Sequence, residues 1–124
     1  MTKTTIKKRV KYWQERLGMK NWDIVIHFEE IKKTKKSSFS TVGRAKIDNE
    51  YKLASFFFPP SQLDGVNDEV IVHEFVHCLL GQYDGYILAN TPLKQKGERW
   101  LEYINEQTTT EIERIIMRLW RKEL

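Results

Sequence analysis

The chain has 124 residues, a net charge of +4, 40% hydrophobic residues and 31% charged residues. This length fits one domain with a single modest core, and the composition is that of an ordinary globular protein. The apolar runs are shorter than the about 18 residues of a membrane span, and residues 1–5 do not lead into the apolar core of a signal peptide. We therefore expect a single domain over residues 1–124 that stays in the cytoplasm and has no membrane partner.

The positive charge is concentrated in two stretches. One is the N-terminal stretch that contains Lys3, Lys7, Lys8, Arg9 and Lys11, and the other is residues 31–36. Such clusters bind nucleic acid in some proteins, but more commonly they form a solvated helix face or a loop. Residues 32–38 are accordingly predicted to form a loop.

The first predicted element is an amphipathic helix over residues 4–17. Its apolar residues recur at intervals of four, three and four, at Ile6, Val10, Trp13 and Leu17. This spacing places them on one face of a helix, which we expect to be buried. Gly18 follows as the C-terminal cap.

Three strands are predicted after this helix. Residues 21–30 alternate, and the apolar side consists of Trp22, Ile24, Ile26 and Phe28. His27 falls on the opposite side, so we expect it at an exposed or edge position rather than at a metal site. Residues 39–47 and 51–58 are predicted to form the second and third strands, and Pro59 ends the third strand.

The next predicted element is a helix over residues 68–80 that contains the motif H-E-x-x-H at residues 73–77. Asn67 or Asp68 is expected to cap its N-terminus, and Gly81 is expected to end it. Strongly apolar flanks predict that this helix is buried in the core.

The two histidines of the motif are four residues apart, so on a helix they lie on one face, about 5.4 Å apart along the axis. His73 and His77 can therefore bind one metal ion, and zinc is the ion expected for this motif. Glu74 lies about 100° around the helix from His73, which lets it reach a water molecule at the metal without being a ligand. We therefore predict that Glu74 is the general base.

The far side of this helix is apolar and consists of Val72, Phe75, Val76 and Leu79. The alternative to a metal site is a pair of histidines, His73 and His77, with a purely structural role.

Cys78 is the one cysteine, so the chain cannot form an internal disulfide and fits a reducing compartment. Because Cys78 lies about 100° around the helix from His77, we expect a small buried apolar residue rather than a metal ligand.

Residues 82–97 are predicted to form a long polar connection, which contains Gly85 and Pro92. A loop of this length in a small domain is usually functional or mobile. A long last helix is predicted from Glu98 to the end of the chain. Its apolar positions follow three- and four-residue steps, at Leu101, Ile104, Thr108, Ile112, Ile115 and Leu119.

A catalytic zinc ion usually has three protein ligands and an open position for water, so with His27 placed elsewhere the third ligand should be a carboxylate. Residues 105–110, Asn-Glu-Gln-Thr-Thr-Thr, resemble the pattern N-E-x-x-S-D of the gluzincins, in which a glutamate on a later helix completes the site. This resemblance implies that Glu106 is the third ligand, with Glu102 and Glu111 as alternatives. On an ideal wheel Glu106 lies about 140° from the apolar stripe of its helix, so the ligand faces are expected to meet at a cleft away from both stripes.

Two positions depart from the gluzincin pattern. Thr109 replaces the serine, and Thr110 replaces the aspartate whose carboxylate supports the first histidine in that family. Another carboxylate would then have to orient the histidine, and the candidates are Asp64, Asp68 and Asp84.

The order of helix, small sheet, motif helix and glutamate helix resembles that of the minigluzincins, which are compact single-domain zincins. It is also similar to small phage and bacterial proteins of the ImmA/IrrE kind, whose glutamate precedes a segment like residues 109–112. Residues 96–100 resemble the H-G-x-x-F/W segment of SprT-like proteases, but Lys96 stands in place of the ligand histidine. The resemblance implies an α+β, zincin-like fold. Its elements would be an N-terminal helix, a twisted sheet of three or four strands, the motif helix and a long C-terminal helix.

These features together predict a zinc metallopeptidase that acts on a peptide or protein substrate. Zn²⁺ would be held by His73, His77 and Glu106, the third strand would offer its edge to an extended peptide, and Tyr83 or Tyr86 would stabilise the oxyanion. The alternative is a latent or inactive zincin-like regulatory or binding module that contacts nucleic acid through its basic segments.

Overall fold

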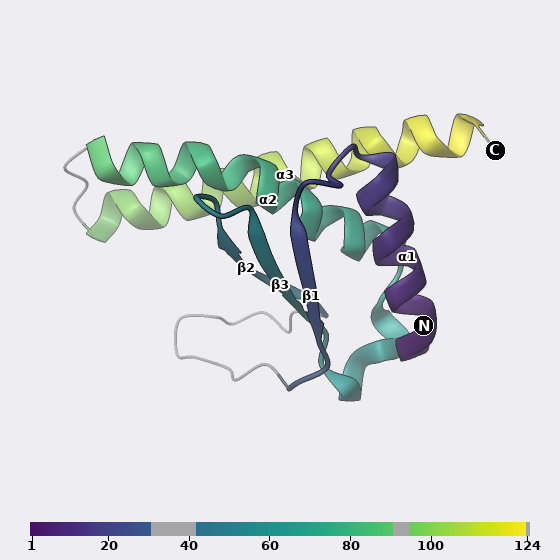
Figure 1. The fold of residues 1–124 in the computed structure, drawn as a ribbon. Helices are drawn as coiled ribbons and strands as arrows, with labels where there is room; N and C mark the ends of the chain where they lie inside the picture. Colours follow the sequence, from purple (N-terminus) through teal and green to yellow (C-terminus); the bar gives the residue numbers. More distant parts are fainter. Residues whose placement is uncertain (31–41, 91–94, 124) are drawn as a thin grey trace.

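The computed structural model describes residues 1–30, 42–90 and 95–123 (Figure 1). The elements in chain order are α1 (Lys3–Arg16), β1 (Asp23–His27), β2 (Arg44–Asp48), β3 (Leu53–Phe57), a 3₁₀-helix η1 (Pro60–Gly65), α2 (Asp68–Asn90) and α3 (Gln95–Glu123). This confirms the predicted α+β fold with a three-stranded sheet in the described part of the chain. Among the described residues, no helix is long and apolar enough to cross a membrane.

Helix α1 forms as its sequence pattern predicts. Thr2 caps its N-terminus by accepting a hydrogen bond from the backbone N–H of Thr5 at 3.2 Å. Gly18 follows the helix with a φ of +71°, the left-handed conformation that favours glycine at a C-terminal cap. The buried side chains of the helix are Ile6, Val10 and Trp13.

The sheet has the strand order β1-β3-β2, in which β3 pairs with β1 in parallel and with β2 antiparallel. The prediction that the third strand offers a free edge is therefore wrong, because β3 lies in the centre and, among the described residues, β1 and β2 are the edge strands. The physical reason is burial: Ala54 and Phe56 of β3 and the adjoining Phe58 are fully buried, as a central strand allows. The second strand begins at Arg44, and residues 31–41, with the predicted basic loop, lie outside the described residues.

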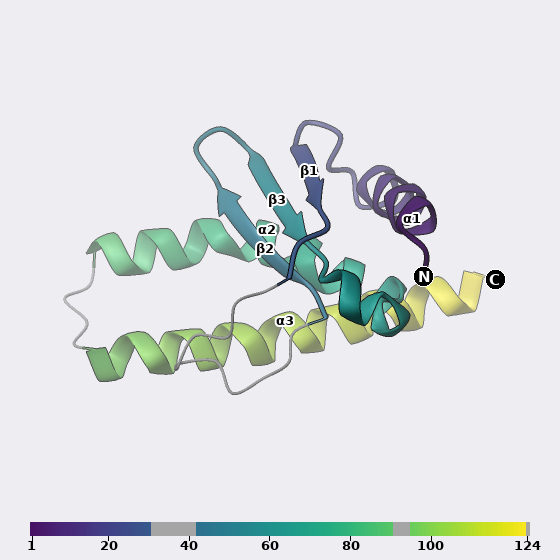
Figure 2. The same ribbon diagram turned by 90° about the horizontal axis from the view of Figure 1, so that it is seen from below.

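One face of the sheet supplies the core together with α1 and α2. Phe56 of β3 packs edge-on against Phe75 of α2, with the ring centroids 5.0 Å apart. Helices α2 and α3 run side by side in both ribbon views, joined through residues 91–94, so they form an antiparallel pair (Figures 1 and 2). Helix α2 therefore has the sheet on one side and α3 on another.

Helix α1 forms hydrogen bonds with both long helices at one end of this pair. Asp68, in the first turn of α2, accepts hydrogen bonds from Arg9 Nε at 2.8 Å, Arg9 Nη2 at 3.0 Å and Trp13 Nε1 at 2.9 Å. Near the end of α3, Trp120 Nε1 donates to Tyr12 Oη at 2.9 Å. The start of α2 and the end of α3 are thus both held by the same helix.

The prediction that Gly81 ends the motif helix is wrong. Helix α2 continues through Gly81 to Asn90 and covers most of the predicted connection, while Pro92 lies outside the described residues. A glycine inside a helix costs only about 1 kcal/mol, which packing along α3 can offset. A Cβ atom at residue 81 would lie 3.0 Å from Asn49 Nδ2, so glycine at this position permits a close approach of α2 to the β2–β3 turn. Helix α3 accordingly begins at Gln95 rather than at Glu98.

The buried face of α3 differs from the predicted apolar stripe. Ile104, Ile115 and Leu119 are exposed, whereas the residues that are buried or packed against the core are Thr109, Ile112, Ile116, Met117 and Trp120. The three- and four-residue steps fit both sets, so spacing alone does not choose between them. The observed stripe passes beside Glu106, so this residue borders the core face instead of lying far from it. On α2, Leu79 is likewise exposed rather than buried.

Candidate metal centre

The two histidines of the motif lie on one face of α2, as predicted. Their rings are 4.8 Å apart between centroids and nearly perpendicular, at 79°. Asn67 caps the helix by accepting a hydrogen bond from the backbone N–H of Val70 at 3.0 Å. The opposite side of the helix is fixed in the core by Ile71, Val72, Phe75 and Val76. His73 and His77 are therefore presented by a helix with little freedom to move.

Helix α3 brings Glu106 to both histidines at once. Its Oε1 atom lies 2.7 Å from His77 Nε2, and its Oε2 atom lies 3.4 Å from His73 Nε2. The alternative ligands Glu102 and Glu111 are exposed, and neither forms an ion pair with a histidine in the part of the chain that the structure describes. The backbone carbonyl of Glu106 accepts a hydrogen bond from Thr110 Oγ1 at 2.9 Å.

His73, His77 and Glu106 could hold a metal ion, because one donor atom of each lies within 4.8 Å of the others. Bonds of about 2.0–2.1 Å in a tetrahedron place ligand atoms about 3.3 Å apart. The distance of 3.4 Å between His73 Nε2 and Glu106 Oε2 meets this requirement. The distance of 2.7 Å between His77 Nε2 and Glu106 Oε1 is shorter and corresponds to a hydrogen bond, so metal binding requires a small opening there. The two imidazoles and the carboxylate fit a divalent ion that prefers nitrogen and oxygen ligands.

The ionisable side chains of this group shift one another's pKa values. Hydrogen bonds from His73 and His77 hold the pKa of Glu106 far below its usual range. Burial lowers the pKa of His73, but the hydrogen bond to Glu106 and the charges of Glu74, Glu106 and Glu113 outweigh burial, so the pKa is raised. Because metal ligands must be deprotonated, metal binding here would release any proton that the histidine nitrogens carry.

Glu74 is nearly fully buried, with 4% of its surface exposed. Burial raises the pKa of Glu74 to about 7, while the charges of His77 and His73 oppose this shift. A carboxyl group with such a pKa can change its protonation state near neutral pH, which is the property that proton transfer requires.

Of the three aspartates proposed to orient the histidine, Asp68 and Asp64 are not placed to do so. Asp68 is bound by Arg9 and Trp13, and Asp64 is exposed on η1 without an ion pair to either histidine in the described part of the chain. The side chain of Asp84 lies outside the described residues. The charges of Glu74, Glu106 and Glu113 raise the pKa of His73, and of these three only Glu113, on α3, was not predicted to belong to the site. It follows Glu106 by seven residues, two helical turns, and this spacing is the signal that could have identified it.

Among the described residues, His27 and Cys78 lie outside the group that could hold a metal ion. His27 stacks on Phe57, with 4.8 Å between ring centroids, on the edge strand β1 as expected. Cys78 is a free, buried thiol, and burial raises its pKa to about 12. Tyr83 is exposed, and the side chain of Tyr86 lies outside the described residues.

Two histidines one turn apart, a carboxylate from a second helix and a buried glutamate beside them form a candidate metal centre. Its geometry comes from α2 and α3 alone, and α1 holds the ends of both helices. Comparisons with protein-family models, with curated proteins and with solved structures found no match.

Proposed function

We propose that this chain is a zinc-dependent peptidase, with zinc bound by His73, His77 and Glu106. The observation that carries the proposal is the simultaneous contact of Glu106 with both histidines across two helices. A structural histidine pair would not need a carboxylate from a different helix at both Nε2 atoms. Proximity of three such donors, two of them on a rigid helix, is what a metal site requires.

The donor set favours a catalytic zinc over a structural one. Structural zinc sites usually have four protein ligands, whereas catalytic sites have three and an open position. Three candidate ligands lie together in the described part of the chain, and the side chain of Glu106 is 60% exposed. A site built in this way would be open to substrate on the side of α3.

Glu74 is the proposed general base. When bound, zinc polarises a carbonyl group and lowers the pKa of water, so that water can attack at neutral pH. Glu74 follows His73 directly and is shielded from solvent, so its carboxylate can take the proton of the attacking water and pass it to the leaving amine. His73, His77 and Glu106 position the reacting groups and take no part in proton transfer.

An extended peptide would bind along β2 rather than along β3. Strand β2 is an edge strand in the sheet formed by the described residues, and the turn that follows it approaches α2 at Gly81, one turn beyond the second histidine. A peptide that adds to this edge forms backbone hydrogen bonds, which give affinity without dependence on its sequence.

The proposal is tested with zinc-loaded protein and a library of unstructured peptides, read by mass spectrometry. Wild type is expected to cleave library members, and Glu74→Gln is expected to keep zinc and fold but to lose cleavage. If zinc-loaded wild type cleaves nothing, or if Glu74→Gln cleaves as well as wild type, the peptidase function is wrong. Retained zinc without any cleavage would favour the latent binding module.

A further inference from the structure

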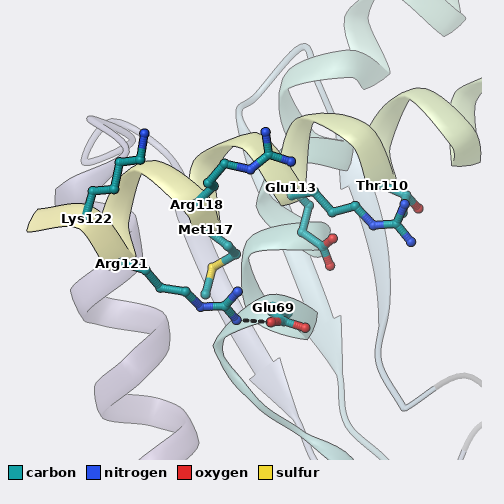
Figure 3. Close-up of a pocket in the computed structure, with 8 residues that line it drawn as sticks. Glu69, Thr110, Glu113, Met117, Arg118, Arg121 and Lys122 are labelled. Atoms are coloured by element: carbon teal, nitrogen blue, oxygen red, sulfur yellow. Dashed lines mark hydrogen bonds and ion pairs between the residues drawn. The ribbon is translucent and has the colours of Figure 1, made fainter. Parts of the chain in front are cut away.

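A groove of about 690 Å³ lies between the start of α2 and the second half of α3 (Figure 3). On α2 it is lined by Glu69, which precedes His73 by four residues and so lies one turn away on the same face. On α3 it is lined by Glu113, which follows Glu106 by two turns. The groove therefore begins about one helical turn from the candidate metal centre on both helices, at Glu69 and Thr110.

Positive charge dominates the wall that α3 contributes to this groove. Its four cationic side chains are those of Arg114, Arg118, Arg121 and Lys122. Against them stand two carboxylates, Glu69 and Glu113, which leaves a balance of +2, four minus two. A cleft lined mainly by one sign of charge concentrates ligands of the opposite sign.

The carboxylates engage only part of this positive charge. Arg121 forms an ion pair with Glu69, drawn as a dashed line in Figure 3. Burial raises the pKa of Glu113, and the charges of His73 and Arg114 oppose this shift, so Arg114 lies within electrostatic range of that carboxylate. Arg118 and Lys122 have no ion pair among the residues that the structure describes. The side chains of Arg118 and Lys122 are thus available to an incoming anion.

The two carboxylates also indicate what kind of anion the groove accepts. A nucleic acid carries a negative charge on every phosphate, so Glu69 and Glu113 would repel a backbone laid along the groove. A single carboxylate can approach Arg118 and Lys122 without meeting these groups closely. The groove therefore suits an isolated negative charge on an otherwise neutral chain.

We propose that this groove is a subsite that binds a carboxylate of the peptide substrate and so gives the enzyme a preference for peptides that carry a carboxylate at a fixed distance from the cleaved bond. The proposal rests on the peptidase function proposed above. With a rise of 1.5 Å per residue, Arg118 and Lys122 lie about 18 and 24 Å along α3 from Glu106. An extended peptide spans about 3.3 Å per residue, so the recognised carboxylate is about five to seven residues from the cleaved bond. It belongs either to a side chain or to the C-terminus of the substrate.

Binding is measured first, by fluorescence anisotropy with zinc-loaded Glu74→Gln, so that no turnover occurs. The probes are labelled twelve-residue peptides with an amidated C-terminus and one glutamate at successive positions, together with glutamine versions and a glutamine peptide with a free C-terminus. We expect the best glutamate peptide, or the free C-terminus, to bind about three- to tenfold more tightly than the amidated glutamine peptide, as exposed ion pairs allow. The preferred probe shows which carboxylate is recognised. The preference should shrink as salt is added.

Charge reversal locates the subsite. In the Glu74→Gln background, Arg118→Glu should make the affinity for the preferred peptide about equal to that for the amidated glutamine peptide. The affinity for the amidated glutamine peptide itself should not change. Lys20→Glu makes the same charge change at an exposed position outside the groove and should keep the preference. Circular dichroism of both variants checks that they fold.

Two sets of results separate this proposal from the peptidase function. If wild type cleaves acidic and neutral peptides with equal kcat/KM and the affinities are equal, the subsite is wrong and the peptidase stands. If nothing is cleaved but the preference exists and is lost in Arg118→Glu, the carboxylate site stands and the peptidase is wrong. A single-stranded oligonucleotide that binds more tightly than any peptide, in a manner that depends on Arg118, would overturn the subsite in favour of nucleic acid.

Discussion

Substitution of Asp68 by alanine tests the role that the fold gives to α1. Asp68 is the acceptor for both Arg9 and Trp13, and it joins the start of the ligand helix α2 to α1. Asp68→Ala removes all three hydrogen bonds while leaving the helix cap at Asn67 intact. We expect a clear loss of stability, because the two donors on α1 lose their acceptor.

The expected decrease in the free energy of unfolding depends on how exposed the side chains of Trp13, Arg9 and Asp68 are to solvent. Trp13 is 1% exposed, so its unpaired N–H would be left without a partner at a cost of about 1–3 kcal/mol. The side chains of Arg9 and Asp68 are 27% and 19% exposed, so solvent screens this ion pair. Its loss adds only about 1 kcal/mol. Together these give about 2–4 kcal/mol, which corresponds to a decrease in Tm of about 10 °C for a domain of this size.

The assay is urea unfolding of metal-free protein, followed by circular dichroism, so that metal binding does not contribute to the free energy of unfolding. Asp64→Ala is the matched control, since Asp64 is exposed on η1, and it should change stability by less than about 0.5 kcal/mol. A double-mutant cycle with Arg9→Met should give a coupling energy of at least about 0.5 kcal/mol. An Asp68→Ala variant as stable as Asp64→Ala, with no coupling to Arg9, would refute the role of α1 in fastening α2.

Three further outcomes are expected. Zinc at a thousandfold excess over Kd should stabilise wild type by about 4 kcal/mol, and chelation should reverse this, as thermal melts of wild type and His73→Ala will show. Cys78 is fully buried, so Ellman's reagent should label it only after unfolding, and rapid labelling of the native chain would contradict its burial. Gly18→Ala should lower the free energy of unfolding by about 1–2 kcal/mol because of its positive φ, whereas Lys20→Ala should be neutral in the same urea titration.

Much of the fold is predictable from local sequence, because the signals are short-range. The spacing of Ile6, Val10 and Trp13, the glycine after α1 and the cap at Asn67 each act within a few residues of the structure they determine. The central position of β3 was not predicted, because strand order depends on pairing between distant segments. A hint was present in the sequence, since Phe56 and Phe58 are large aromatic residues on one side of a short strand.

The candidate site was also predictable only in part from local sequence. The alignment of His73 and His77 follows from helical periodicity, and resemblance to a known motif pointed to Glu106. The position of Glu113 and the basic groove depend on how α2 and α3 are paired along their length, which periodicity does not define. Gly81 shows the same limit, because its closeness to Asn49 is a tertiary contact that a local reading mistakes for a helix end.

The central claim is that His73, His77 and Glu106 bind one zinc ion, and the most direct test is metal content. Wild type, Glu106→Ala and Glu111→Ala are loaded with zinc, desalted and analysed by mass spectrometry for zinc per chain. Glu111 is an exposed glutamate of the same helix and is therefore the matched control. We expect about one zinc ion per chain in wild type and Glu111→Ala and a large loss in Glu106→Ala. Full zinc in Glu106→Ala, or none in wild type, would contradict the account.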